Sequence, residues 1–265
     1  MESSIKKLFG RCSLCPFGVC ALEDDLLIKN VRSYKKIPLN SKSVMLFLFP
    51  YYVGEFPKRN ISKYAMLKDY HKVAGEMLEE AVVNLQKEFP LNSFHAFVDS
   101  SPIKEVKAAV RAGLGCLGKN SLLINETYGS YCFIGEIVTD LCLPASCFHK
   151  ECLNCNLCVK SCPKNAIGDF RIDEGRCLSA LTQKKGELTD EERESIKNNG
   201  SVWGCDICQD VCPLCKNPAK TPFKEFMEMV VPFVDEENLD GFFPVSSFAW
   251  RKKATILRNI RIVNS

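Results

Sequence analysis

The segment ECLNCNLCVKSCP, residues 151–163, decides the fold of this chain. Its four cysteines and the proline that follows them are Cys152, Cys155, Cys158, Cys162 and Pro163. This spacing is typical of bacterial 4Fe–4S loops, in which a short loop places three thiolates on three corners of one cubane. The cysteine before the proline reaches a second cluster, and the proline turns the chain away. The segment therefore predicts a compact module built around two clusters.

A second motif with the same ending follows at residues 204–213, GCDICQDVCP. Because the cysteine before each proline serves the other cluster, we expect two ligand sets that cross between the motifs. The first set, called the first quartet below, is Cys152, Cys155, Cys158 and Cys212. The second set needs a fourth ligand, and the best candidate is the isolated cysteine that lies between the motifs. This second quartet is Cys162, Cys177, Cys205 and Cys208.

Two four-cysteine zinc sites are the alternative, since zinc modules also use cysteines separated by two residues. Zinc, however, gives no reason for a third cysteine at the next turn or for a proline after each terminal cysteine. We therefore favour the clusters. Near the N-terminus, Cys12, Cys15 and Cys20 are one ligand short of a closed metal site, so we expect buried apolar residues there.

The composition is that of an ordinary globular protein apart from its cysteines. The chain has 265 residues, 16 of them cysteine, 46% hydrophobic residues and a net charge of +3. The N-terminal residues MESSIKK have no apolar signal core behind them, and the most apolar run, residues 44–53, is half a membrane span. We expect a cytoplasmic protein without a membrane partner, because dense cysteines in a reducing compartment serve metals rather than disulfides.

The periodic segments predict an α+β fold. We expect a buried strand at 44–53, an amphipathic helix at 63–88, strands at 94–98 and 131–139, and a basic terminal helix at about 250–263. Ser101 and Pro102 have the pattern of a helix start, and Gly113 that of a helix end.

We expect three parts in the chain. Residues 1–145 form an α+β domain, residues 146–220 a ferredoxin-type domain with two 4Fe–4S clusters, and residues 221–265 a helical tail packed on the core. Residues 113–118, GLGCLG, match the glycine pattern of dinucleotide-binding loops, but a helix rather than a strand precedes them. We therefore expect these glycines to let the backbone lie close to a different large ligand.

Several further segments, taken together, resemble epoxyqueuosine reductases. They are DYHK at 69–72, the aspartate motif Asp99-Ser100-Ser101-Pro102, AGLGCLGKNS at 112–121, GSYCFIGE at 129–136 and WGCDICQDVCP at 203–213. The resemblance implies a cobalamin-binding α/β sandwich-type domain followed by a bacterial-ferredoxin-like double-cluster module. It further implies that the clusters pass electrons to cobalamin, which removes the epoxide oxygen of epoxyqueuosine at the wobble position of tRNA.

The resemblance implies that Asp99 is the acid of this reaction. The alternative is a turn residue, since an aspartate between a strand and a helix often serves turn chemistry. At the end of an apolar strand, we expect a carboxyl whose raised pKa lets it protonate the leaving oxygen. We assign no role to His71 or His95, because a lone histidine is more often structural. The candidates for cobalamin contacts, with a structural turn as the equal alternative, are Gly118, Lys119, Asn120, Gly129 and Ser130.

The chain departs from the family pattern at three places. The family has Ser-Tyr-Leu-Thr-Ile-Glu where this chain has SALTQK at 179–184, and Trp-Asn where it has Leu214 and Cys215. The chain also stops where many members continue into C-terminal helical repeats that grip tRNA. From the resemblance we expect tRNA and an external low-potential electron donor as partners. Because of these three departures, two alternative functions stay open. One is a reductase of small epoxides or halogenated compounds, and the other is a non-enzymatic ferredoxin-type electron carrier.

Overall fold

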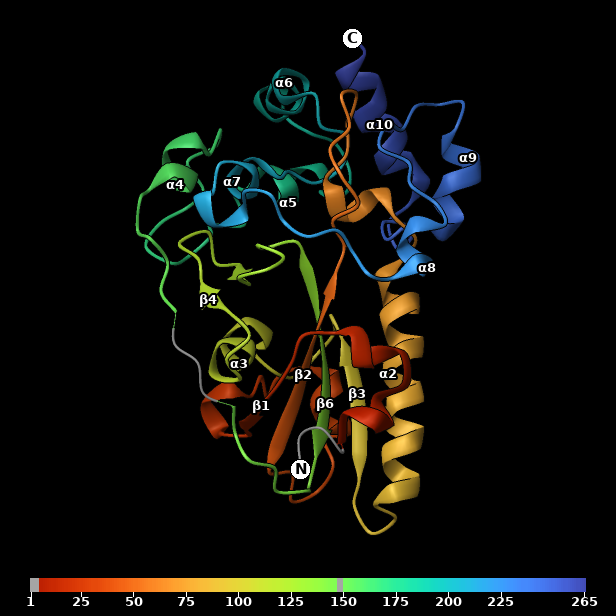
Figure 1. The fold of residues 1–265 in the computed structure, drawn as a ribbon. Coiled ribbons are helices and arrows are strands. Elements are labelled where there is room, and N and C mark those ends of the chain that lie inside the picture. Colours follow the sequence, from red (N-terminus) through yellow and green to blue (C-terminus); the bar gives the residue numbers. More distant parts are fainter. Residues whose placement is uncertain (1–4, 147–149) are drawn as a thin grey trace.

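A four-stranded antiparallel sheet forms the lower half of the molecule in the computed structural model, which describes residues 5–146 and 150–265 (Figure 1). The strands are, in order across the sheet, β1 (Phe17–Ala21), β2 (Ser43–Pro50), β6 (Cys132–Thr139) and β3 (Phe94–Val98). Each neighbouring pair is antiparallel. The predicted mixed α and β fold class is confirmed, as are the strands expected at 44–53, 94–98 and 131–139.

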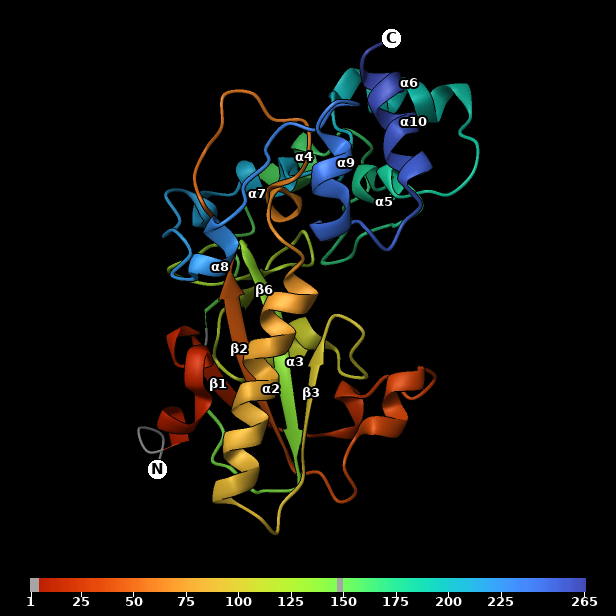
Figure 2. The ribbon, with the colours of Figure 1, turned by 90° about the vertical axis from the view of Figure 1, so that its right-hand side faces the viewer.

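Strand β2 is the centre of the core because helices cover both faces of the sheet. All its residues are buried. Since side chains alternate between the faces, Met45, Phe47 and Phe49 pack on the side of helix α2 (Tyr70–Glu88). Val44 and its alternate neighbours pack on the side of α3 (Glu105–Arg111). Figure 2 shows the two helices on opposite faces of the sheet.

The long helix begins later than the prediction of 63–88. Residues Lys63–Met66 form the separate 3-10 turn η4, and α2 starts at Tyr70. The Asp69 side chain caps this start by accepting a hydrogen bond from the His71 backbone N–H at 3.0 Å. The cap at Asp69 determines where the helix begins. The hydrophobic periodicity does not show this boundary, because it continues through the 3-10 turn that precedes the helix.

The predicted helix start at Ser101 is wrong. Helix α3 begins at Glu105, and the Ser101 hydroxyl instead donates to the buried Glu136 and accepts from the Ile103 N–H. The predicted end is confirmed, because Gly113 follows the helix with a φ of +74°.

The glycine-rich segment 113–118 lets the chain pack against itself. It leads into a small hairpin of β4 (Cys116–Leu117) and β5 (Leu123–Ile124). A Cβ atom on Gly115 would lie 2.3 Å from the Ile124 carbonyl oxygen, so only glycine fits there. The hairpin, rather than a ligand, accounts for this glycine.

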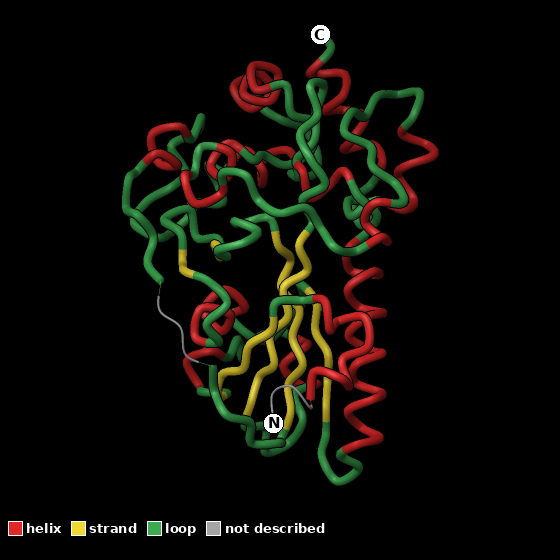
Figure 3. The backbone as a smooth tube through the Cα atoms, in the orientation of Figure 1, coloured by secondary structure: helices red, strands yellow, loops and turns green. Residues whose placement is uncertain are grey.

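The upper half of the molecule consists of short helices and loops, as the tube in Figure 3 makes plain. Its helices are α4 (Leu157–Ser161), α5 (Leu178–Thr182), α6 (Asp190–Asn199), α7 (Ile207–Asp210), α8 (Lys224–Met227), α9 (Leu239–Phe242) and α10 (Lys253–Val263). The remaining elements are the 3-10 turns η1 (Lys7–Leu14), η2 (Asp24–Leu26), η3 (Arg32–Lys36), η5 (Pro213–Cys215) and η6 (Phe243–Val245). In this half α4 packs against α7, which brings the two cysteine motifs together.

The terminal helix α10 is fastened to the cysteine-rich part through one buried side chain. Asn259 is fully buried, and its amide donates to the carbonyls of Thr182 and Val202 at 2.7 and 2.9 Å. A bridge between Ile61 and Trp203 ties residues of the first predicted domain into the same half. The three-part division at 145 and 220 stays a prediction, and these contacts show that the parts interlock.

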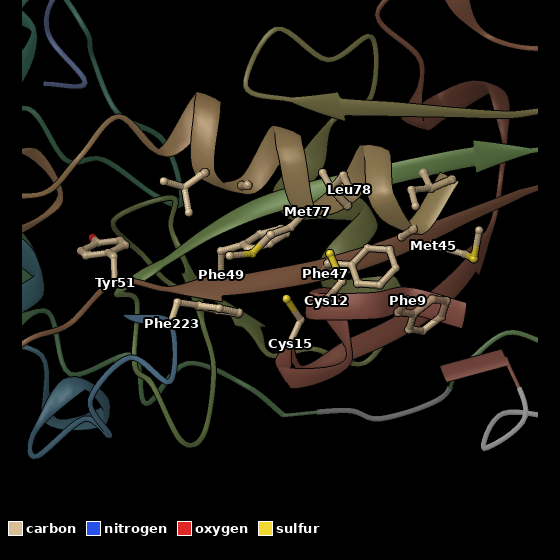
Figure 4. Close-up of a cluster of buried hydrophobic side chains, with 14 of the residues drawn as sticks. Phe9, Cys12, Cys15, Met45, Phe47, Phe49, Tyr51, Met77, Leu78 and Phe223 are labelled. Carbon is tan, nitrogen blue, oxygen red and sulfur yellow. The ribbon is translucent and has the colours of Figure 1, made fainter. Parts of the chain in front are cut away.

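The N-terminal cysteines lie in the apolar core. Cys12 and Cys15 pack between η1, β2 and α2, among the aromatic side chains shown in Figure 4. Cys20 is buried on the other face of the sheet. Burial raises the pKa of Cys15 well above its ordinary value, so its thiol stays neutral. The expectation of buried apolar cysteines is confirmed. No helix in the described part of the chain is long and apolar enough to cross a membrane.

Candidate active site

The four cysteines of the first quartet line one cavity. They come from the loop before α4, from α4 itself and from the turn after α7, and the cavity also contacts Lys119, Asn120 and Asn156. Cys212 therefore lies with the three cysteines of the first motif, which is the crossed arrangement expected from the spacing. Among the four, Cys155 is the exposed one, so this cavity lies at the surface.

The second quartet lies deeper. The Cys205 thiol has those of Cys162 and Cys177 as electrostatic neighbours, and Cys208 faces Cys205 and Cys177. Burial raises the pKa of Cys205 to about 11 and that of Cys208 to about 12. The backbone N–H of Ala166 donates to Cys162 Sγ at 3.3 Å, as amides do around cluster thiolates.

Two observations fit these quartets to clusters. Within residues 5–146 and 150–265, no three His, Cys, Asp or Glu side chains are close enough to share a single metal ion. A cubane, in contrast, takes its four thiolates at separate corners. The second observation is Asn120, a residue only 2% exposed whose amide lies beside Cys208 and lowers its pKa against the effect of burial. Neither amide atom has a hydrogen-bond partner of normal geometry.

Two adjoining cavities lie between the second quartet and Asp99. The inner cavity, about 700 Å³, is lined by Cys177, Cys205 and Cys208. The outer cavity, about 660 Å³, is lined by Asp99 and His71. Tyr64, Tyr70 and Gln183 line both cavities, so the two adjoin each other at these side chains, and together they are called the cleft below.

Two aspartates hold the His71 ring at the outer end of the cleft. Nδ1 of His71 lies 2.7 Å from the Asp69 carboxylate, and Nε2 lies 3.4 Å from Asp99 Oδ2. Tyr70 stacks on His71 with ring centroids 4.0 Å apart and donates a hydrogen bond to Asp99. Asp99 directly follows β3 with a φ of +61°, an uncommon backbone conformation that is often found at functional sites.

In the pair formed by Asp99 and His71, the histidine rather than the aspartate carries the proton. Burial lowers the pKa of His71, but hydrogen bonds to Asp69 and Asp99 outweigh it and raise that pKa to about 9. The His71 hydrogen bond in turn lowers the pKa of Asp99, and burial opposes this only in part. The raised pKa expected for Asp99 is therefore wrong, because sequence reasoning gave no role to the histidine beside it.

Behind Asp99 lies a pair of buried carboxyls. Glu136 is fully buried, and burial raises its pKa to about 8 against the hydrogen bond from Ser101. Burial and the neighbouring Glu136 raise the pKa of Glu105 well above its ordinary value, and Glu105 accepts the backbone N–H of Asp99. One oxygen of each carboxyl has no partner. The pair thus anchors the turn that carries Asp99.

The candidates for cobalamin contacts separate into two groups. Ser130 lines the inner cavity of the cleft, where its hydroxyl donates to Gln209 at 2.9 Å. Lys119 and Asn120 line the cavity of the first quartet instead. Gly118 lies against the Leu122 carbonyl, and Gly129, with a φ of +59°, lies against Cys215.

Sequence reasoning missed Ser121, whose hydroxyl is buried without a partner in the inner cavity. It also missed Trp250, which lines the outer cavity. A role for His71 could have been inferred from the sequence, because His71 belongs to the DYHK segment at 69–72, one of the segments that resemble epoxyqueuosine reductases.

Comparison with known proteins covers both halves of the chain. A family model described as "4Fe-4S double cluster binding domain" matches residues 151–214, and one described as "Epoxyqueuosine reductase QueG, DUF1730" matches residues 33–100. The chain is 39% identical over 256 residues to an epoxyqueuosine reductase of Cyclobacterium marinum, covering 87% of this chain and 79% of that one. It is 40% identical over 184 residues to that of Leadbetterella byssophila, covering 68% of this chain and 60% of that one.

Among solved structures, the fold is similar to an epoxyqueuosine reductase crystallised with an epoxyqueuosine-modified tRNA-Tyr stem loop. The TM-score is 0.83 at 24% identity, over 99% of this chain and 80% of that one. The chain spans 60%, 61% and 44% of the length of three curated relatives. Residues 151–214 are a double 4Fe–4S cluster domain, which excludes the zinc alternative. The chain belongs to the epoxyqueuosine reductase family, whose members combine two such clusters with cobalamin.

Proposed function

We propose that this chain reduces the epoxide of epoxyqueuosine to the alkene of queuosine in tRNA. The observation that carries the proposal is the cleft, in which the cavity lined by three cysteines of the second quartet adjoins the cavity lined by Asp99 and His71. The curated relatives named for this activity and the tRNA-bound structure of a similar protein support it. The tRNA substrate and the reduced cysteines also favour a cytoplasmic location.

The reaction needs two electrons and two protons, which convert the epoxide into a carbon–carbon double bond and one water molecule. Each 4Fe–4S cluster passes one electron at a time, so the two quartets together supply the pair. When bound, cobalamin supplies the low-potential cobalt chemistry that breaks the carbon–oxygen bond. The protein has to hold this cofactor, conduct electrons to it and deliver protons.

The inner cavity has the side chains to hold cobalamin. The Ser121 hydroxyl, buried without a partner, is free to bond an amide of the corrin rim. Ser130 and Tyr51 both donate to Gln209, which in turn donates to Asp206, and this chain of bonds stiffens the wall. We therefore move the proposed cobalamin contacts to the inner cavity, where Ser121 joins Ser130 from the predicted set. Gly118, Lys119, Asn120 and Gly129 are no longer part of the proposed contacts.

The outer cavity delivers the protons. At neutral pH His71 is protonated, since its pKa is about 9. Asp69 fixes the ring, so Nε2 points at Asp99. We propose that Asp99 passes the proton of His71 to the leaving oxygen, which keeps Asp99 as the catalytic residue. His71 then takes a proton from solvent and returns to the imidazolium form, and the same route delivers the second proton that completes the water molecule.

Electrons enter at the first quartet in this proposal. Its cavity lies at the surface, and the exposed Cys155 marks the side from which an electron donor can approach the cluster. The Lys119 ammonium that lines this cavity is held by the Asn156 side chain and by the Asp169 carboxylate, 3.8 Å away. The second quartet then passes the electrons into the cleft. The external low-potential donor stays part of the proposal.

The test is anaerobic reconstitution followed by turnover. We expect about eight irons and one cobalt per chain after incubation with cobalamin and desalting. With a chemical reductant and tRNA carrying epoxyqueuosine, digestion and mass spectrometry then show loss of one oxygen atom from the nucleoside. Full iron and cobalt without turnover of tRNA, but with turnover of a small epoxide or halogenated compound, would support the small-molecule alternative. Iron without cobalt would support the electron carrier.

A further inference from the structure

The outer cavity contains an exposed aromatic side chain that the proposed chemistry does not use. The chain has two tryptophans, and Trp203 is buried at 1% exposure whereas Trp250 is 59% exposed. Trp250 nevertheless lines the same cavity as Asp99 and His71. A large apolar ring left open beside a reactive pair is unusual for a folded chain, because its burial elsewhere would be favourable.

The Trp250 ring is held in place by its neighbours. The Arg251 guanidinium lies over it, with Cζ 3.9 Å from the ring centroid. Trp203 meets it edge-on, with ring centroids 6.3 Å apart. A ring that is fixed before binding loses little conformational entropy when a flat ligand stacks on it.

Unpaired polar groups surround this ring. Ser247 is only 4% exposed, lines the outer cavity, and has a hydroxyl without a hydrogen-bond partner. Gln183 contributes a side-chain amide to the same lining. The Arg251 Nε is also buried without a partner, and the next residue, Lys252, is exposed. Buried polar groups without partners in a cavity indicate a ligand that supplies them.

We propose that Trp250, Ser247 and Gln183 form a nucleobase-binding subsite, in which the ring stacks a base that flanks the reacting nucleoside. This inference rests on the proposed function, because it takes RNA as the substrate. An aromatic ring with an adjacent arginine is the usual platform for an unstacked base, and a hydroxyl and an amide suit the polar edge of that base. Lys252 follows two residues after Trp250 in the chain and is exposed, so its charge is available for a phosphate of the same RNA.

The two tryptophans make the test direct. We expect an epoxyqueuosine-containing RNA stem loop to quench tryptophan emission and to protect it from acrylamide, since only Trp250 is accessible. Trp250→Phe abolishes this optical change while retaining most of the binding, because it keeps a ring. Trp250→Ala weakens the dissociation constant, measured by fluorescence anisotropy of a labelled stem loop, about 10- to 100-fold. Ser247→Ala weakens it by a smaller factor.

Controls separate this inference from the proposed function. Leu91→Ala removes another exposed apolar side chain, 95% exposed and in the loop between α2 and β3, and should bind RNA like wild type. Iron and cobalt contents show whether each variant folds. If wild type does not bind or convert tRNA, the proposed function fails. If wild type converts tRNA while its emission is unchanged and Trp250→Ala has wild-type affinity, the subsite is refuted and the function stands.

Discussion

The two cysteine quartets are built from the same two motifs but lie in different surroundings. The first lines a cavity of its own, with Cys155 exposed and Lys119 at the rim. Three cysteines of the second quartet line the inner cavity of the cleft, next to the cavity that Asp99 lines. Burial raises the pKa of two of them, Cys205 and Cys208. Because the ligand types are identical, the proposed function assigns their roles by position: the first cluster would receive electrons from outside, and the second would pass them to the cleft.

The largest expected effect comes from breaking the second quartet. Cys208→Ser should leave the first cluster intact, halve the iron and abolish turnover, by a factor of roughly 1,000 or more, as for the loss of other essential groups. Cys158→Ser is the matched variant, since it also halves the iron but leaves the second cluster next to the cleft. With a small chemical reductant that reaches the cleft directly, Cys158→Ser should keep measurable turnover.

Iron analysis, electron paramagnetic resonance and the nucleoside assay check this pair of variants. Equal loss of turnover in both, with a small reductant present, would remove the functional difference between the quartets. An unchanged iron content in either variant would refute its assignment as a ligand.

The Asp99–His71 pair should give the next largest effect. Asp99→Asn keeps the shape of the side chain but removes its charge, and we expect a loss of roughly 100- to 10,000-fold in turnover with full iron and cobalt. The same change lowers the pKa of His71, because the Asp99 carboxylate helps to raise it to about 9. The His71 resonances in NMR titrations of the two proteins measure that shift directly.

The pH dependence of the wild type follows from the same pair. Since the imidazolium form is required, turnover should fall as the pH rises through about 9. The stability that the charged pair contributes is fully present below the ordinary histidine pKa of 6.5, and it is lost as the pH rises from there through about 9. A rate that is flat across this range would show that His71 does not supply the proton.

The grouping of the cysteines was predictable from the sequence, and the surroundings of Asp99 were predictable only in part. Spacing decides which thiolates reach one cluster, so the crossed quartets follow from local geometry. His71 meets Asp99 only because α2 lies along β3, a contact between elements that spacing does not reveal. The helix starts at 63 and 101 were misplaced for a similar reason, since Asp69 and Glu136 take the hydrogen bonds that determine the boundary.

The buried carboxyls behind Asp99 predict an effect on stability. Because Glu136 has a pKa of about 8 in the folded protein, above its ordinary value of 4.5, folding favours its protonated form. The wild type should therefore lose stability as the pH rises from about 4.5 to 8, by roughly 3 to 5 kcal/mol. Glu136→Gln, which is neutral throughout, should reduce this loss in urea unfolding at several pH values, and the part that remains belongs to Glu105, whose pKa burial also raises. The exposed Glu237→Gln serves as control, and parallel pH curves for wild type and Glu136→Gln would contradict the assignment.

The smallest expected effect tests the boundary between the two quartets. Asn120 lines the cavity of the first quartet, yet its amide lies beside Cys208 of the second. Because a hydrogen bond donated to a cluster stabilises the reduced, more negative state, Asn120→Leu should lower the midpoint potential of the second cluster. One such bond is worth about 1 kcal/mol, or roughly 40 mV for one electron. In a redox titration followed by electron paramagnetic resonance, a shift confined to the second cluster assigns the amide to it. A shift of the first cluster alone would instead show that Asn120 acts where electrons enter.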